Sequence, residues 1–112
     1  MFNFYVLLVF APLLFLVGIA GFVIPERKSI TSGATAYNTF HIIFGLIGLA
    51  IVWSQEPVAV RAFNIGFGLI DLYQGAASYL NLFPKNQFKW KRADDVLHVL
   101  IGAGLVAVGL FA

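Results

Sequence analysis

The sequence predicts an all-α integral membrane protein in which four transmembrane helices form two tandem hairpin repeats. The 112 residues are 61% hydrophobic and 11% charged, with a mean hydropathy of +0.92. Soluble domains carry about 25% charged residues. The sequence also contains four long apolar stretches and a repeated octet with a histidine, which predict the four helices and the repeat. Because so few polar side chains cannot cover a soluble domain, we expect the lipid bilayer to surround a single domain over residues 1–112.

Four stretches approach the roughly 20 residues that a helix needs to cross about 30 Å of hydrocarbon. The first ends before Pro25. The second ends before a short turn in which Pro57 suits the first turn of the third helix. The fourth is short and would cross with little tilt. The expected spans are 3–24, 38–54, 58–83 and 95–112.

An internal repeat links the two halves of the chain. A shift of 57 positions places the octet 38–45 on the octet 95–102 without gaps, and Lys28 on Lys85. The predicted repeat units are about 1–55 and 58–112. A unit with two spans repeats in the same orientation, so both termini are expected on the same side of the membrane. His41 and His98 are then expected at equal depth.

Basic residues predict the orientation in the membrane. The connecting loops at 26–37 and 84–94 hold six of the seven Lys and Arg residues, and Arg61 is the seventh. The positive-inside rule places these loops in the cytoplasm and both termini outside the inner membrane. Phe88 and Trp90 alternate with lysines and are expected among the lipid headgroups. Charges confined to loops do not predict nucleic-acid binding.

Each histidine follows a polar residue by three positions near the start of an expected helix. The preferred interpretation is structural, with Asn38 and Asp95 capping the two helices and the imidazoles completing the caps. The alternative is that His41 and His98 face each other and supply axial ligands to one haem b, or bind a pigment. The first interpretation predicts no cofactor. No metal site is expected either, because a closed site wants about four ligands.

Polar and small residues mark one face of the third span. Asp71 lies near its centre, where an ionised carboxylate costs about 2.5 to 3.5 kcal/mol. Two roles fit this position: a neutral carboxyl that only forms a structural hydrogen bond, or a carboxyl that belongs to a functional site. Helical rise places Asp71 about 12 Å from the depth of the histidines, so direct pairing is not expected. The face is expected to contact protein and contains Arg61, Asn64, Gly68, Asp71, Gly75 and Ser78.

A family resemblance rests on residues in the last three spans, namely Asn38, His41, Gly45, Gly48, Arg61, Gly68, Gly75, Asp95, His98 and Gly102. Over nearly its whole length the chain resembles a family of small four-span prokaryotic membrane proteins of unknown function. The resemblance implies the fold and the topology only. Asp71 departs from the family pattern, in which an aromatic residue is usual at this position.

The sequence has no glycine-rich phosphate loop, no nucleophile with a nearby base and no cysteine, so we do not expect an enzyme. The leading hypothesis is a structural, assembly or interaction subunit that packs laterally with itself or with larger membrane complexes. The alternatives are a bis-histidine haem or pigment protein, and a small proton-linked transporter that uses Asp71.

Overall fold

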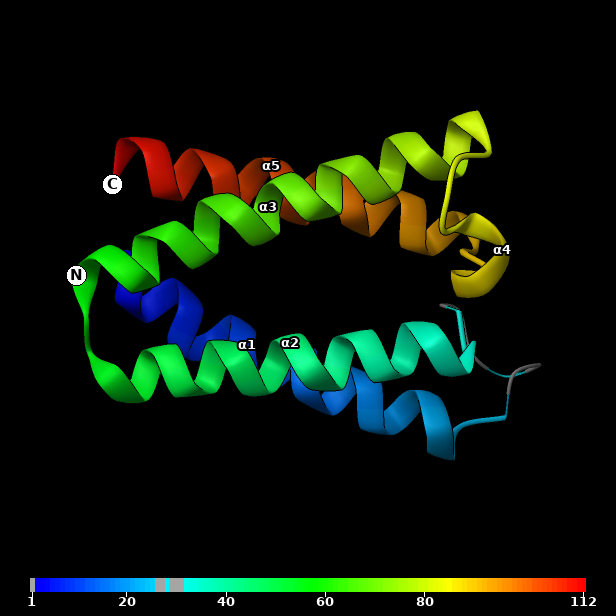
Figure 1. The fold of residues 1–112 in the computed structure, drawn as a ribbon, viewed down its shortest axis with the longest axis horizontal. Helices are drawn as coiled ribbons and strands as arrows, with labels where there is room; N and C mark the ends of the chain where they lie inside the picture. Colours follow the sequence, from blue (N-terminus) through cyan, green and yellow to red (C-terminus); the bar gives the residue numbers. More distant parts are fainter. Residues whose placement is uncertain (1, 26–27, 29–31) are drawn as a thin grey trace.

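The computed structural model describes residues 2–25, 28 and 32–112, and within these ranges the regular structure is helical. Four long helices run nearly alongside one another, and a short helix lies in the last connection (Figure 1). Helix α1 packs chiefly against α2, and α3 chiefly against α5. The helices are α1 (Phe2–Val23), α2 (Thr35–Ser54), α3 (Pro57–Leu80), α4 (Lys85–Phe88) and α5 (Arg92–Phe111).

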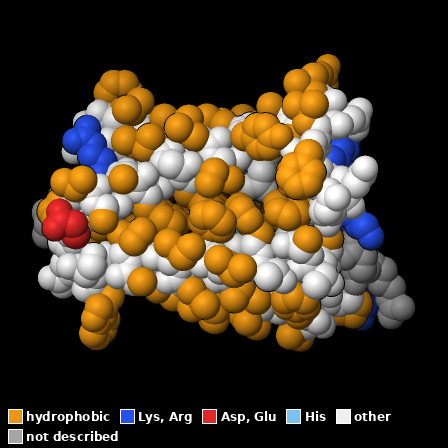
Figure 2. Space-filling model, viewed as in Figure 1, with side chains coloured by type: hydrophobic (Ala, Val, Ile, Leu, Met, Phe, Trp, Pro, Cys, Tyr) orange, Lys and Arg blue, Asp and Glu red, His pale blue; other side chains and the backbone are white. Residues whose placement is uncertain are grey.

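Both chain ends lie at one end of the bundle, together with the turn between α2 and α3 (Figure 1). We call this the terminal end. Helix α4 and the connection before α2 lie at the opposite end, which we call the loop end. On the face shown in Figure 2, apolar side chains cover the middle and charged side chains gather at the two ends. This distribution is typical of a protein whose middle is surrounded by hydrocarbon.

Helices α1, α2 and α5 are each long and apolar enough to cross a bilayer, which indicates a membrane protein. Helix α3 has 24 residues but carries more polar side chains. Its predicted protein-facing stripe is confirmed for Asn64, Gly68, Asp71, Gly75 and Ser78, which are all buried. Gln74 joins them, whereas Arg61 is exposed at the terminal end.

The starts of α2 and α5 differ from the prediction by three residues. Their N-cap residues are Ala34 and Lys91, so the predicted capping roles of Asn38 and Asp95 are wrong. Asp94 instead closes the start of α5, because its Oδ2 accepts the N–H of Lys91 at 2.8 Å. An acceptor at the third helical position satisfies one of the free N–H groups at a helix start.

Helix α3 ends at Leu80, three residues before the predicted boundary. Asn81 adopts a left-handed conformation with φ of 59°, which stops the helix. The Lys85 ammonium donates to the Ser78 carbonyl at 2.6 Å and to Asn81 Oδ1 at 2.8 Å. A cation on the last carbonyls stabilises a helix C-terminus, so the loop lysine fixes the end of α3.

Glycines allow the helices of each pair to approach closely. A Cβ added to Gly45 on α2 would lie 2.6 Å from the backbone nitrogen of Phe15 on α1. A Cβ added to Gly102 on α5 would lie 2.9 Å from the backbone nitrogen of Leu72 on α3. Both distances are shorter than any carbon can keep, so backbone packs on backbone at these points.

Candidate functional site

A cavity of about 250 Å³ lies between the long helices toward the loop end. Apolar side chains from α1 and α5, including Leu14 and Leu97, form one part of its wall. The other part is made of five polar side chains from α2, α3 and α5, namely Tyr37, His41, Asp71, Asp94 and His98. A polar cluster within an apolar cavity is the usual form of a small-molecule site, so we treat this cavity as the candidate site.

Tyr37 lies between the two imidazoles. Its hydroxyl is 2.5 Å from Nε2 of His98, and these two residues are 61 positions apart in the chain. The His41 ring meets the Tyr37 ring edge-on, with a centroid distance of 4.2 Å. The centroid of the His98 ring is 5.7 Å from that of Tyr37. The structure therefore brings both predicted histidines to one tyrosine, which the sequence prediction did not include.

Each histidine keeps one ring nitrogen without a partner. Nδ1 of His41 and Nδ1 of His98 are buried and have no hydrogen-bond partner among the described residues. The side chains themselves are 8% and 5% exposed. A buried polar atom without a partner costs about 1–3 kcal/mol, so each nitrogen has an unused capacity to bind a polar group.

Asp71 belongs to a chain of hydrogen bonds on the α3 side of the cavity. Its Oδ1 accepts from Nε2 of Gln74 at 3.3 Å, and Oε1 of Gln74 accepts from Nε1 of Trp90 at 3.1 Å. The Trp90 ring is edge-on to the His98 ring, with a centroid distance of 6.1 Å. Trp90 is 8% exposed, so its predicted place among headgroups is wrong. Its N–H finds a partner inside the bundle instead.

Asp94 closes the loop end of the cavity. Besides the N–H of Lys91, its Oδ2 accepts the N–H of Ser32 at 2.7 Å. The Ser32 hydroxyl donates to the carbonyl of Phe88. One carboxylate thus ties the connection before α2 to the connection before α5. Charge-assisted bonds of this kind are about twice as strong as neutral ones, so Asp94 holds the two hairpins together at this end.

The observed helix starts place His41 and His98 further inside the bundle than predicted. Each histidine is the seventh residue of its helix rather than the third. Three to four extra residues move the ring about 5 to 6 Å further from the helix start. All three side chains line the same cavity, although among the described residues the hydrogen bond of the Asp71 side chain is with Gln74 and not with either histidine.

Asn38 and Asp95 lie one turn before the histidines and outside the cavity lining. Nδ2 of Asn38 donates to the carbonyl of Gly33 at 3.0 Å. This bond fixes the connection that leads into α2. Oδ1 of Asp95 is buried without a partner among the described residues. Neither side chain closes a helix start, and neither contacts the cavity.

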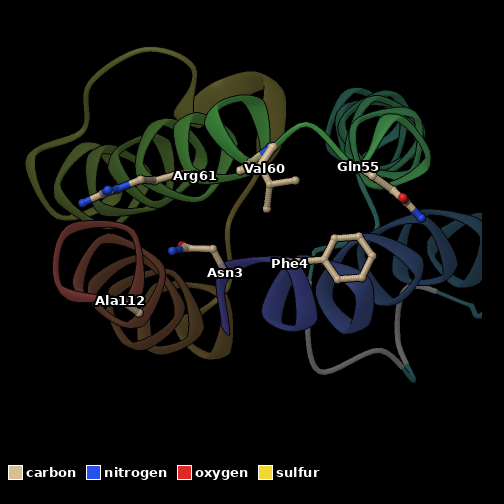
Figure 3. Close-up of a pocket in the computed structure, with 7 residues that line it drawn as sticks. Asn3, Phe4, Gln55, Val60, Arg61 and Ala112 are labelled. Atoms are coloured by element: carbon tan, nitrogen blue, oxygen red, sulfur yellow. The ribbon is translucent and has the colours of Figure 1, made fainter. Parts of the chain in front are cut away.

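Arg61 lines a pocket of about 380 Å³ at the other end of the bundle (Figure 3), and Asn64 contacts Asn3 of the same lining. Arg61 Nε donates to the Gly109 carbonyl at 2.6 Å, and Nη2 donates to Leu110 at 3.3 Å. Nδ2 of Asn64 donates to the backbone and side-chain oxygens of Asn3 at 3.1 and 3.0 Å. These polar groups hold helix ends in place, which is a structural role.

The cavity does not fit a haem held between His41 and His98. Axial ligation needs a nitrogen from each ring directed at one iron atom, with the space between the two rings left open for the haem. Nε2 of His98 already contacts the Tyr37 hydroxyl, and the Tyr37 ring lies against both imidazoles. In the described ranges no three His, Asp or Glu side chains gather in a way that could hold a metal ion.

Sequence reasoning missed Tyr37, Gln74, Trp90 and Asp94. A signal existed for Tyr37, because it precedes His41 by four positions and so shares its helix face. A comparison of the chain with protein-family models, curated proteins and solved structures finds no match. The geometry of the cavity therefore carries the functional argument.

Proposed function

We propose that the chain is a four-span inner-membrane protein made of two tandem hairpin repeats. Helices α2 and α5 each have 20 residues and begin 57 positions apart, at Thr35 and Arg92. Helices α1 and α3 also end 57 positions apart, at Val23 and Leu80. The shift found in the sequence is thus the shift between equivalent helix boundaries, which supports the repeat.

The close contacts within the two hairpins follow the same shift. Gly45 approaches Phe15 as Gly102 approaches Leu72, and each partner is displaced by 57 positions. Gly18 faces Ile42, as Gly75 faces Val99. Four residues of the first hairpin thus have counterparts with the same neighbours in the second. This agreement supports α3 as a span equivalent to α1, despite its polar side chains.

Orientation follows from charge. The described loop-end residues include Lys28, Lys85, Lys89, Lys91 and Arg92, whereas Arg61 and Glu56 lie at the terminal end. Glu26 and Arg27, which also belong to the predicted loop 26–37, lie outside the described residues. The positive-inside rule supports a cytoplasmic loop end, with the loops 26–37 and 84–94, and an external terminal end.

We propose that the protein is a binding protein without catalytic activity, and that it holds a small molecule in the cavity. The observation that carries this proposal is a cavity lined by two histidines and three further polar side chains, in which Nδ1 of each histidine is buried and has no partner among the described residues. A bound molecule with a polar group would satisfy these nitrogens. Binding would then remove the free-energy cost of burying two polar atoms without partners.

Purification in mild detergent, followed by extraction and mass spectrometry of small molecules, tests this function. We expect a small molecule to be retained at about one equivalent per protein chain. The double variant His41→Leu, His98→Leu should not retain it. The control is Leu100→Ala, which alters the outward face of α5, where the Leu100 side chain is 65% exposed. Equal retention by all three proteins, or none by any, would contradict the proposal.

An interaction subunit is a second candidate, favoured by the outer surface of α3. A Cβ added to Gly66 would meet no atom within 4 Å, so this glycine leaves a notch in an exposed helix face. Small residues let another helix approach closely in lipid. We expect a defined oligomer or a partner in mild detergent, weakened by Gly66→Phe. A monomer without partners would contradict this candidate.

Proton-linked transport through Asp71 stays a prediction, and its position in the cavity with two histidines favours testing it. Asp71→Asn keeps the shape of the side chain and its bond with Gln74 but cannot exchange a proton. Flux driven by a proton gradient in reconstituted vesicles would be lost in this variant. Unchanged flux, or no flux in the unsubstituted protein, would contradict transport.

A further inference from the structure

An apolar groove of about 500 Å³ runs along the outside of the bundle between α1 and α5. Its wall extends from Phe2 to Leu13 on α1 and from Ile101 to Val108 on α5. These two helices make few contacts with each other, so the space between them stays open toward the surroundings. Helical rise gives the α1 wall a length of about 17 Å.

The groove and the candidate cavity are continuous. Phe10, Leu13 and Ile101 line both, so they form a shared boundary between the apolar groove and the polar cavity. In a bilayer the groove faces hydrocarbon and not water. The cavity can therefore be reached sideways from the lipid, and a molecule that fills both spaces needs a polar head and an apolar chain.

The charges around the cavity indicate an uncharged head. Among the residues that the structure describes, no Lys or Arg lines the cavity or the groove, whereas Asp71 and Asp94 both line the cavity. A phosphate or carboxylate head would thus lack a counter-charge and would face two acidic side chains in a medium of low dielectric. A neutral head that forms hydrogen bonds meets neither cost.

The unpartnered histidine nitrogens narrow the chemistry further. Nδ1 donates in one tautomer of a neutral imidazole and accepts in the other. A quinone carbonyl accepts a hydrogen bond, and the hydroxyl of the corresponding quinol donates one, so this pair suits either tautomer. The aromatic rings of Phe10 and Tyr37 in the cavity wall also suit a flat ring.

We propose that the ligand is a prenyl quinone or its quinol, with the ring in the cavity beside His41 and His98 and the prenyl chain along the α1–α5 groove. This inference rests on the proposed binding function and names its ligand class. Binding is noncovalent, and the polar contacts come from the polar side chains that line the cavity, with His41 and His98 among them. A chain longer than the groove would continue into the lipid.

Trp90 provides an optical probe of the cavity. The chain has two tryptophans, and Trp53 is 89% exposed whereas Trp90 is buried beside His98. In a Trp53→Phe background, reconstituted in lipid nanodiscs, Trp90 is the sole source of tryptophan fluorescence. We expect a short-chain prenyl quinone to quench this fluorescence along a saturable curve. A linear response without saturation would indicate partition into the lipid alone and would overturn the proposal.

Two phenylalanine variants of α5 test the groove. Gly104 lines it, and a Cβ added there meets no atom within 4 Å, so Gly104→Phe can fold and fill the groove. Leu100→Phe is the matched control, because Leu100 is 65% exposed on the same helix but lies outside the groove lining. We expect at least a tenfold loss of apparent affinity in Gly104→Phe and no change in Leu100→Phe. Equal affinities in the two variants would overturn the proposed path of the chain.

Competing ligands separate this inference from the broader function. Saturable quenching by the quinone that is not relieved by an excess of a long-chain fatty acid, or of the same prenyl chain without oxygen, supports the assigned class. Relief of the quenching by the fatty acid would overturn the quinone while the cavity remains a binding site. If quenching by the quinone does not saturate and no molecule is retained on purification, both proposals fail. A changed oligomeric state in Gly104→Phe with unchanged quenching would make the groove a protein interface and overturn its assignment to a prenyl chain.

Discussion

The Tyr37 hydroxyl lies 2.5 Å from Nε2 of His98 and thereby connects α2 of the first hairpin to α5 of the second. The helices of each hairpin pack mainly on each other. An apolar core between the hairpins, with Phe67 against Phe10, and this polar contact together join the two halves. The same tyrosine ring also supports His41. Tyr37 is therefore a positioning residue for both imidazoles of the cavity.

Replacement of Tyr37 by phenylalanine should lower the stability of the folded protein. Tyr37→Phe removes the hydroxyl and leaves Nε2 of His98 buried without this partner. We expect a loss of about 1 to 2 kcal/mol in the free energy of unfolding, measured by equilibrium unfolding in mixed micelles. Tyr79→Phe, at a side chain that is 86% exposed, is the control and should have no effect. Equal effects in the two variants would contradict a bond between the hairpins.

The glycine contacts predict a sharp difference between two alanine variants. Gly45→Ala would place a methyl group 2.6 Å from the backbone of Phe15, so α1 and α2 must separate. We expect a destabilisation of about 1 to 3 kcal/mol, as in other overpacked sites. The methyl group of Gly66→Ala would meet no neighbour, so the free energy of unfolding of this variant should stay within about 1 kcal/mol of that of the parent protein. Thermal unfolding in detergent measures both, and a larger cost at Gly66 would contradict the packing.

The long helices could be predicted from the sequence because hydropathy and Pro25, Glu56 and Pro57 mark most of their limits. The starts of α2 and α5 could not, because the residues that fix them come from both connections. Asp94 accepts N–H groups from Ser32 and from Lys91, and Ser32 is 62 positions away. A local pattern such as Asn38 followed by His41 carries no information on such a partner.

The candidate site was predicted in part. His41 and His98 were predicted to complete helix caps or to bind a haem or pigment, and Asp71 was predicted as an intramembrane polar residue. All three side chains line the cavity, whereas Asn64 and Arg61, the other predicted intramembrane polar residues, do not. Trp90 was misplaced because an alternation of aromatic and basic residues fits a membrane interface as well as a buried turn. Tertiary contacts with Gln74 and His98 decide between these two placements, and only the fold supplies them.

Arg61 is expected to protect the last turn of α5 against local opening. Its guanidinium donates to the carbonyls of Gly109 and Leu110, which have no partners further along the helix. Arg61→Gln should lower the free energy of local opening of this turn by about 1 kcal/mol. Amide hydrogen exchange in the turn should then be roughly fivefold faster, with little change in α2. Arg61→Lys keeps the charge and should give an intermediate rate. Unchanged exchange in Arg61→Gln would contradict the capping role.

The chain has no cysteine, so single introduced cysteines can test the proposed orientation without background. Ser54 at the terminal end and Asn86 at the loop end are both exposed. Because the basic residues gather at the loop end, we expect Ser54→Cys to react with a membrane-impermeant maleimide in intact spheroplasts. Asn86→Cys should react only after the membrane is made permeable. The reverse labelling pattern would show that the protein has the opposite orientation in the membrane. Labelling of both cysteines in intact spheroplasts would contradict four spans, since an even number of crossings between Ser54 and Asn86 would place them on one side.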